Sequence, residues 1–425
     1  MSQFHEAKPL WRETDGHRRW LSAEADSLFA FYEVDSIRSS GGFWTLDEFG
    51  KPLPTEQSRP LHVTTRMVHC FAIAHLLGRP GAADLVDHGM QALRARHRDS
   101  AHGGYFWSFD DDGPRERDKL AYGHAFVLLA AASAKCVGHP EADALLSDIA
   151  EIIETRFWEP GPGASKEEFR EDWTPFSDYR GQNANMHLTE ALMAAYEATG
   201  ERSFLDKAES IADLILRRNA AAADWRVPEH YKADWTVDRD YRGSDMFRPY
   251  GVTPGHALEW ARLALQLWNL GARKLDWLPG AARALFARAV GEGWDPARGG
   301  LYYTLEWTGA PRVRDRLWWP CCEGIGAAAF LGALDEGNDY EAWYRRLWDF
   351  CARHFIDRRN GGWRLQLDDA LSPVAGYFAG KPDIYHAVQA CLIPLYPADG
   401  SLTRGILRTQ GGGGAQSPSN SAVER

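Results

Sequence analysis

The sequence lacks long apolar runs and has no excess of positive charge. No stretch of about 18 uncharged apolar residues occurs, so we expect no membrane-spanning helix. Lys and Arg number 48 against 59 Asp and Glu, and the formal net charge of -11 argues against a nucleic-acid partner, because phosphate binding needs clustered cations. The first twenty residues are polar and lack the apolar segment of a signal peptide, which predicts a cytoplasmic location.

Cysteine is scarce, and the common metal and nucleotide motifs are missing. The 6 cysteines lie mostly in apolar stretches, which is typical of reduced, buried thiols rather than of a disulfide framework. The sequence contains no HExxH, no GxGxxG after a strand and no GxxxxGK[ST]. The sequence leaves open whether histidines from separate helices gather around a metal. We nevertheless predict chemistry that uses no metal and no cofactor.

What is present is a repeat of about sixty residues. Each repeat has an amphipathic helix, a turn that is often Gly-Gly followed by an aromatic residue, and a helix that is apolar nearly all round. The amphipathic helices are expected at 20–34, 81–98, 140–157, 202–218, 277–293 and 339–355. The apolar helices are expected to begin near Arg66, Ala121, Asn183, Thr253, Pro320 and Pro382.

A helix that is apolar on all sides must be buried. Six buried helices alternating with six amphipathic ones predict an all-α (α/α)6 barrel, a six-hairpin toroid with short β-hairpins in its loops. We expect residues 1–402 to form this single domain. The Gly- and Ser-rich residues 403–425 are expected to be a disordered tail.

Titratable residues recur near the starts of the apolar helices, 55 to 69 residues apart. A single histidine at such a position is usually capped or packed in the core. A whole set is hard to assign to packing, because burying charge is costly. In a barrel with parallel inner helices the set would converge on one pocket. Its members are His69, His124, His187, His256, Glu323 and His386.

Imidazoles suit proton transfer, because histidine titrates near neutral pH. His256 and Glu259 are three residues apart, hence on one helix face. A carboxylate beside an imidazole orients the ring and favours its protonated form. The other groups expected to bind a hydroxyl-rich substrate are Arg66, Asn183, Tyr122, Trp319, Glu323 and Asp383.

Several longer motifs carry a family resemblance over roughly residues 15–397. They are TTRMVH (64–69), RPGAADLVDHG (79–89), DYRGQNANMH (178–187), YGVTPGHALEW (250–260), WWPCCE (318–323) and GKPDIYH (380–386). With these motifs the chain resembles the N-acylglucosamine 2-epimerase superfamily, and more closely its aldose–ketose isomerase branch of mannose and sulfoquinovose isomerases. The resemblance implies an (α/α)6 barrel and cofactor-independent chemistry through a cis-enediol(ate).

The resemblance also implies roles for single residues. Arg66 resembles the arginine that holds substrate hydroxyls near the reacting carbons. His187 resembles a substrate-contacting histidine that helps to open the sugar ring. His256 and His386 resemble the two acid/base histidines, and Glu259 resembles the carboxylate paired with the first of them.

These roles predict an isomerase that interconverts D-mannose and D-fructose, and also D-lyxose and D-xylulose, by proton transfer between C2 and C1. A sulfoquinovose–sulfofructose isomerase or a sugar 2-epimerase of the same superfamily is the alternative. A sulfonate needs additional donors, and Arg248 is a candidate near the rim. Pro382 argues against this alternative, because proline has no N–H to offer.

Two other classes of protein remain possible. A glycoside hydrolase on the same fold would need two facing carboxylates, whereas most cavity positions here are histidine. A non-catalytic binding toroid would show affinity without turnover. The expected partner is a monosaccharide, and the sequence predicts no oligomeric state. The long connections 158–180 and 220–250 are candidate lids over the cavity.

Overall fold

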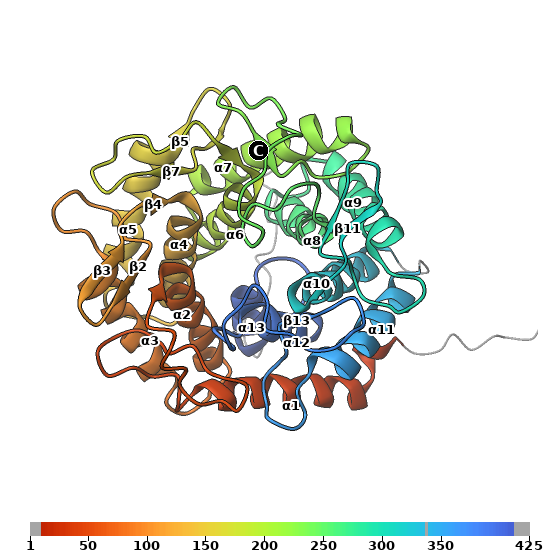
Figure 1. Ribbon diagram of the computed structural model, residues 1–425, viewed down its shortest axis with the longest axis horizontal. Helices are drawn as coiled ribbons and strands as arrows, with labels where there is room; N and C mark the ends of the chain where they lie inside the picture. Colours follow the sequence, from red (N-terminus) through yellow and green to blue (C-terminus); the bar gives the residue numbers. More distant parts are fainter. Residues whose placement is uncertain (1–9, 336–338, 412–425) are drawn as a thin grey trace, which may run out of the picture.

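Two concentric rings of helices make up the computed structural model, which describes residues 10–335 and 339–411 (Figure 1). The inner ring consists of α2 (Leu61–Leu76), α4 (Ala121–Cys136), α6 (Gln182–Thr199), α8 (Pro254–Leu270), α10 (Trp318–Leu334) and α12 (Tyr385–Leu392). The outer ring consists of α1 (Asp15–Tyr32), α3 (Ala82–Ala92), α5 (Ala142–Ile152), α7 (Arg202–Ala212), α9 (Trp277–Gly293) and α11 (Tyr340–Phe350). The predicted (α/α)6 barrel is therefore confirmed.

The burial of each helix follows from its sequence. The inner helix α4, AYGHAFVLLAAASAKC, is buried from Ala121 to Ala134, whereas the outer helix α3 buries one face and exposes the other. The ring closes because α12 packs against α1, α2 and α10, which brings the last inner helix beside the first outer helix (Figure 1). Within the described residues, no helix is both long and apolar enough to cross a membrane.

Short antiparallel strand pairs connect the helices, as predicted. β1 (Arg59–Pro60), β2 (Ser108–Asp110) and β3 (Gly113–Glu116) form one small sheet. The two-stranded pairs are β4 (Lys119–Leu120) with β7 (Glu168–Phe169), β5 (Trp158–Glu159) with β6 (Ala164–Ser165), β8 (Arg180–Gly181) with β9 (His230–Tyr231), β10 (Thr304–Leu305) with β11 (Pro311–Val313), and β12 (Arg316–Leu317) with β13 (Gln366–Leu367).

Four outer helices end in wider π-helical turns, at Leu93–His97, Ile153–Phe157, Asp213–Ala220 and Cys351–Phe355. Short 3-10 helices lie at Trp11–Glu13, Ala221–Ala223 and Ile393–Leu395. Two of these π-helical turns, Leu93–His97 and Cys351–Phe355, lead into Gly-Gly hairpins, and the glycines there adopt positive φ, as at Gly103 (78°) and Gly104 (75°).

Buried basic residues fix where several inner helices begin. Lys119, two residues before α4, lies 2.8 Å from Asp99 of the preceding Gly-Gly hairpin. Arg316, two residues before α10, pairs in the same way with Asp295 at 2.5 Å. Because a buried charge is costly unless it is paired, these ion pairs hold the chain where it enters the inner ring.

The boundary predicted for the C-terminal tail was wrong. Residues Leu402–Gly411 form α13, which packs against α2. Ile406 is fully buried, and Gln410 donates a hydrogen bond to the backbone oxygen of Leu76. The Gly- and Ser-rich composition hid this helix, and the rest of the predicted tail, 412–425, lies outside the described residues.

Candidate active site

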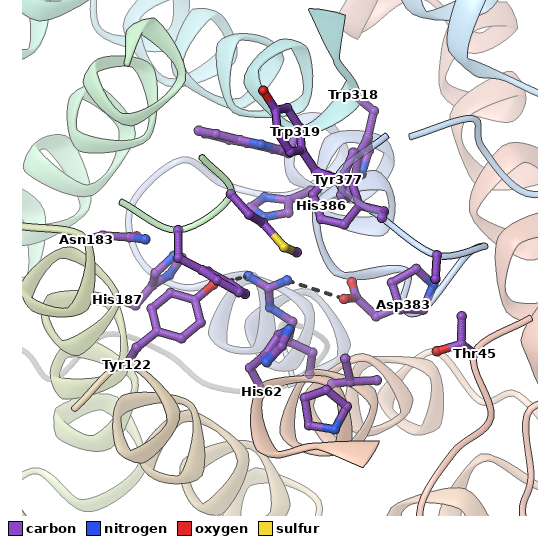
Figure 2. Close-up of a pocket in the computed structure, with 18 of the residues that line it drawn as sticks. Thr45, His62, Tyr122, Asn183, His187, Trp318, Trp319, Tyr377, Asp383 and His386 are labelled. Carbon is purple, nitrogen blue, oxygen red and sulfur yellow. Dashed lines mark hydrogen bonds and ion pairs between the residues drawn. The ribbon is translucent and has the colours of Figure 1, made fainter. Parts of the chain in front are cut away.

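The starts of all six inner helices border a cavity of about 330 Å³ (Figure 2). Because the inner helices run in parallel, their first turns meet at one end of the barrel axis. The walls are formed mainly by aromatic rings, imidazoles and carboxyl groups. Figure 2 shows His187, His386, Trp319 and Asp383 around this space.

His256 and His386 have the same local arrangement. The Nδ1 atom of His256 lies 2.9 Å from both carboxylate oxygens of Glu229, and that of His386 lies 2.8 Å from Glu323 Oε1. An ionised carboxylate only accepts hydrogen bonds, so we assign the proton of each ring to Nδ1. Gln182 Nε2, which also lies 2.9 Å from His256 Nδ1, then donates to Glu229. No described residue hydrogen-bonds either Nε2 atom, so in both rings Nε2 is left for a substrate.

The indole of Trp319 lies against both of these imidazoles. Its ring centroid is 5.0 Å from that of His256 and 5.8 Å from that of His386. Gly255, just before His256, permits this packing, because a β-carbon there would lie 2.4 Å from the indole. The two rings therefore share one aromatic platform in the cavity wall.

The partner of His256 differs from the one predicted. Glu229, which no local pattern in the sequence identified, lies in the connection before α8 and also accepts a hydrogen bond from Gln182 Nε2 at 2.8 Å. Burial alone would raise the pKa of Glu229, but His256 and the hydrogen bonds lower it below its ordinary value. The predicted partner, Glu259, instead lies 3.7 Å from His187 Nδ1.

His187 lies between two carboxyl groups, which form a second cluster of titratable residues in the site. Its Nδ1 lies 3.7 Å from both Glu190 and Glu259 and has no hydrogen-bond partner among the described residues. Burial lowers the pKa of His187 to about 4, with Glu190 acting in the opposite direction, so the ring is neutral at physiological pH. Burial and the charges of Glu323 and Glu190 raise the pKa of Glu259 well above its ordinary value.

Arg66 is held on the cavity floor between acidic and aromatic groups. Its Nη1 lies 3.3 Å from Asp383 Oδ2, and its Nη2 donates to the hydroxyl of Tyr122 at 3.0 Å, as the dashed lines in Figure 2 show. The guanidinium lies over the rings of Phe126 and Tyr385. Its Nε is buried and has no hydrogen-bond partner among the described residues.

His62 was not among the predicted site residues, because the start of α2 was expected near Arg66, five residues after its actual start at Leu61. His62 lines the cavity and stacks on Trp107, with ring centroids 5.1 Å apart. Burial, together with Arg66, lowers the pKa of His62 well below its ordinary value. It is therefore a neutral group in an aromatic part of the wall.

Two histidines of the predicted set lie outside the cavity. His69 is two turns along α2, where its Nδ1 is 2.7 Å from the hydroxyl of Ser133. His124 points into the hairpin region, where its Nε2 accepts the backbone N–H of Tyr105 at 3.1 Å. Similar spacing along the sequence therefore does not show whether a histidine lies in the first turn of its helix or one or two turns further along.

Two predicted substrate-binding residues are also placed elsewhere. Glu323 lies behind His386 and is bonded to it, so it does not line the cavity. Arg248 turns away from the cavity and forms an ion pair with Glu168 at 2.7 Å. The remaining predicted site residues all line the cavity, namely Arg66, Tyr122, Asn183, His187, His256, Glu259, Trp319, Asp383 and His386.

The two long connections contribute differently to the cavity. The segment 220–250 supplies Met246 and Phe247 to the wall. No described residue of 158–180 lines the cavity, but Glu168 from this segment holds Arg248 next to Phe247. One connection therefore forms part of the wall and the other supports it.

Two groups of residues have the spacing to hold a metal ion within the described ranges. They are Asp99, His102 and Glu171, and His187, Glu190 and Glu259. The ammonium group of Lys119 already pairs with Asp99, and the guanidinium of Arg262 lies 3.5 Å from Glu190. In both places a cation of the chain itself neutralises the carboxylates. The 6 cysteines are free, as predicted.

Comparison with known proteins identifies similar sequences and a similar fold. Residues 41–390 match the family described as N-acylglucosamine 2-epimerase (GlcNAc 2-epimerase). A D-mannose isomerase of Thermobifida fusca is 45% identical over 95% of this chain and 100% of that protein. A D-mannose isomerase of Pseudomonas cannabina pv. alisalensis is 43% identical over 92% and 96% of the two chains. A crystal structure of a D-mannose isomerase superposes with a TM-score of 0.85 at 33% identity, covering 92% of this chain and 99% of the other.

Proposed function

The chain belongs to the N-acylglucosamine 2-epimerase family, and we propose that it is an aldose–ketose isomerase interconverting D-mannose and D-fructose. One observation carries this proposal above the others. Two imidazoles in one cavity, His256 and His386, each have Nδ1 on a buried carboxylate and Nε2 free. Such a pair can take a proton from one carbon and return a proton to its neighbour.

The reaction follows from these positions. One imidazole Nε2 removes the proton on C2 of the open-chain aldose, and the electron pair moves into the C1–C2 bond while charge develops on O1. O1 then takes up a proton and O2 gives one up, so that C2 becomes the carbonyl carbon. Delivery of a proton to C1 completes the ketose. Glu229 and Glu323 stabilise the imidazolium that forms on His256 or His386.

Arg66 and His187 are suited to the oxygen atoms of the sugar. The guanidinium of Arg66 lines the cavity and provides a fixed positive charge for the enediolate oxygens. His187 is neutral and can exchange a proton with the ring oxygen when the pyranose opens. Asn183 also lines the cavity, where its amide group adds hydrogen-bonding capacity for a hydroxyl.

The cavity favours an uncharged sugar over a sulfonate or phosphate. Among the described lining residues, Arg66 is the one lysine or arginine, and Asp383 already pairs with it. Arg248, the candidate donor for a sulfonate, is neutralised by Glu168. An anionic sugar would therefore lose its water shell without gaining a free cation in return. We propose neutral aldoses with the C2–C4 configuration of mannose, D-lyxose included.

The proposed chemistry requires proton transfer alone, so we suggest testing it with a chelator present. The purified protein is incubated with D-mannose or D-fructose in D2O and followed by NMR. Formation of the other sugar, with deuterium entering at C1 or C2, is expected. Conversion of mannose to glucose would indicate a 2-epimerase, release of a monosaccharide from a disaccharide would indicate a hydrolase, and binding without turnover would indicate a binding protein. The cytoplasmic location stays a prediction.

A further inference from the structure

Below the cavity, one arginine faces three buried glutamates from three inner helices. The Nη2 atom of Arg262, on α8, lies 3.0 Å from Glu323 Oε2, 3.5 Å from Glu190 Oε1 and 3.8 Å from Glu259 Oε1. Its Nε also donates to Glu323 Oε2 at 3.1 Å. The guanidinium is 1% exposed. It therefore gives its two closest contacts to a single carboxylate, that of Glu323.

Glu323 connects this arginine to the proposed acid/base pair. Its Oε2 accepts a hydrogen bond from the guanidinium of Arg262, and its Oε1 accepts one from the Nδ1–H of His386 at 2.8 Å. Gly326, one turn along α10, leaves the space for the arginine, because a β-carbon there would lie 3.0 Å from Arg262 Cδ. The geometry joins Arg262, Glu323 and His386 in a continuous chain beneath the cavity.

We propose that Arg262 is a positioning residue that keeps Glu323 ionised, and thereby keeps the proton of His386 on Nδ1 and its Nε2 free for the substrate. The inference rests on the proposed isomerase function. Arg262 itself does not line the cavity, so it acts through Glu323 and not by touching the sugar.

The reason is the balance of charge in a site shielded from water. Three carboxyl groups share one guanidinium, and an ionised carboxylate without a partner is costly to bury. Glu259, the most distant of the three, has no hydrogen bond to a described residue on either oxygen and a pKa well above the ordinary value. Burial also works to raise the pKa of Glu323, but Arg262 and His386 bring it below its ordinary value.

Loss of the guanidinium would reverse the hydrogen bond to His386. A protonated Glu323 would donate to Nδ1 instead of accepting from it. The imidazole proton would then be on Nε2, where it blocks proton abstraction from the sugar. Arg262, Glu323 and His386 also face other charged or titratable groups, namely Arg66, His69, His187, Glu190, Glu259, Asp383 and Tyr385.

The test is the pH dependence of kcat/KM for mannose in Arg262→Met. We expect the acid limb of this profile, where kcat/KM falls as the pH decreases, to move to higher pH by about one unit or more. The reason is that the Glu323–His386 pair now holds a proton over a wider pH range. Activity should recover as the pH rises further. Arg262→Lys, which keeps the charge, should retain a limb near that of the wild type. Arg59→Met, which removes a buried arginine bonded to Asp111 outside the cavity, should lower stability without moving the limb.

An Arg262→Met enzyme that is slower at every pH, with its acid limb unmoved, would overturn the proposal. If this variant does not fold, Arg262→Gln replaces it, because glutamine keeps a donor for Glu323 but no charge, and the same shift is required. A second readout needs no turnover. Nitrogen-15 NMR of His386 in the free protein should show the Nδ1–H form in the wild type and the Nε2–H form in the variant at neutral pH. A protein that fails to isomerise mannose but shows this change would refute the proposed function and not the role of Arg262.

Discussion

Replacing Glu323 with glutamine isolates the contribution of one buried carboxylate to the proposed acid/base pair. The substitution keeps the size of the side chain and removes the charge that faces His386 Nδ1 at 2.8 Å. An opposite charge this close favours the protonated imidazole by about one to three pKa units, equivalent to about 1.4–4 kcal/mol. His386 becomes an imidazolium when it accepts the substrate proton, so we expect kcat to fall about 10- to 1000-fold.

The same change should lower the pKa of His386 further, so the acid limb of kcat/KM should move to lower pH in Glu323→Gln. This direction is opposite to the one expected for Arg262→Met. Initial rates of fructose formation are measured from acidic to alkaline pH, with folding checked by denaturant unfolding. Glu197→Gln is the matched control, because the side chain of Glu197 is also buried but accepts a hydrogen bond from the backbone N–H of Ser401, outside the cavity. A Glu323→Gln enzyme with the rate and acid limb of the wild type would refute this reasoning.

Three further predictions concern the same cavity. Burial lowers the pKa of His386, with Glu323 opposing, so its NMR titration midpoint should lie below about 6.5, and a midpoint above that value would contradict the assignment. Gly255→Ala forces a β-carbon to within 2.4 Å of Trp319; we expect a loss of about 1–3 kcal/mol in the free energy of unfolding and a lower kcat/KM. The control Gly280→Ala, with nothing within 4 Å, should fold at least as stably, and equal effects of the two substitutions would argue against a role for the indole. D-Lyxose should be converted at a measurable rate and sulfoquinovose should not, and the reverse preference in competition assays would reject a cavity for neutral sugars.

The ring of helices could be predicted from the sequence because helical periodicity is a local property. The outer helix expected at 277–293 is found at Trp277–Gly293, and the inner helix expected from Ala121 begins there. Helix starts were less certain than helix interiors, because none of these helices begins with a side-chain cap. The helix α2 begins at Leu61 after Pro60, with no side-chain cap, and this hid His62.

The pairing of charges in the site could not be read from local spacing. His256 and Glu259 lie three residues apart on one helix face, yet the partner of His256 is Glu229, from a connection 27 residues away in sequence. The carboxylate that bonds to His386 is Glu323, which lies 63 residues away in sequence, on α10. Such pairs are set by the packing of neighbouring helices, which a single sequence does not show. Composition likewise suggested a tail where α13 packs on the barrel.

His256 and His386 are central to the proposed reaction, as the two groups that carry protons between C2 and C1. Each is replaced separately by asparagine, and conversion of D-mannose to D-fructose is followed by NMR at the pH of maximal wild-type activity. Each acid/base group contributes about 10²–10⁴-fold, so both variants should fold like the wild type and lose at least about a hundredfold in rate. A folded variant of either residue that converts mannose at close to the wild-type rate would contradict the account.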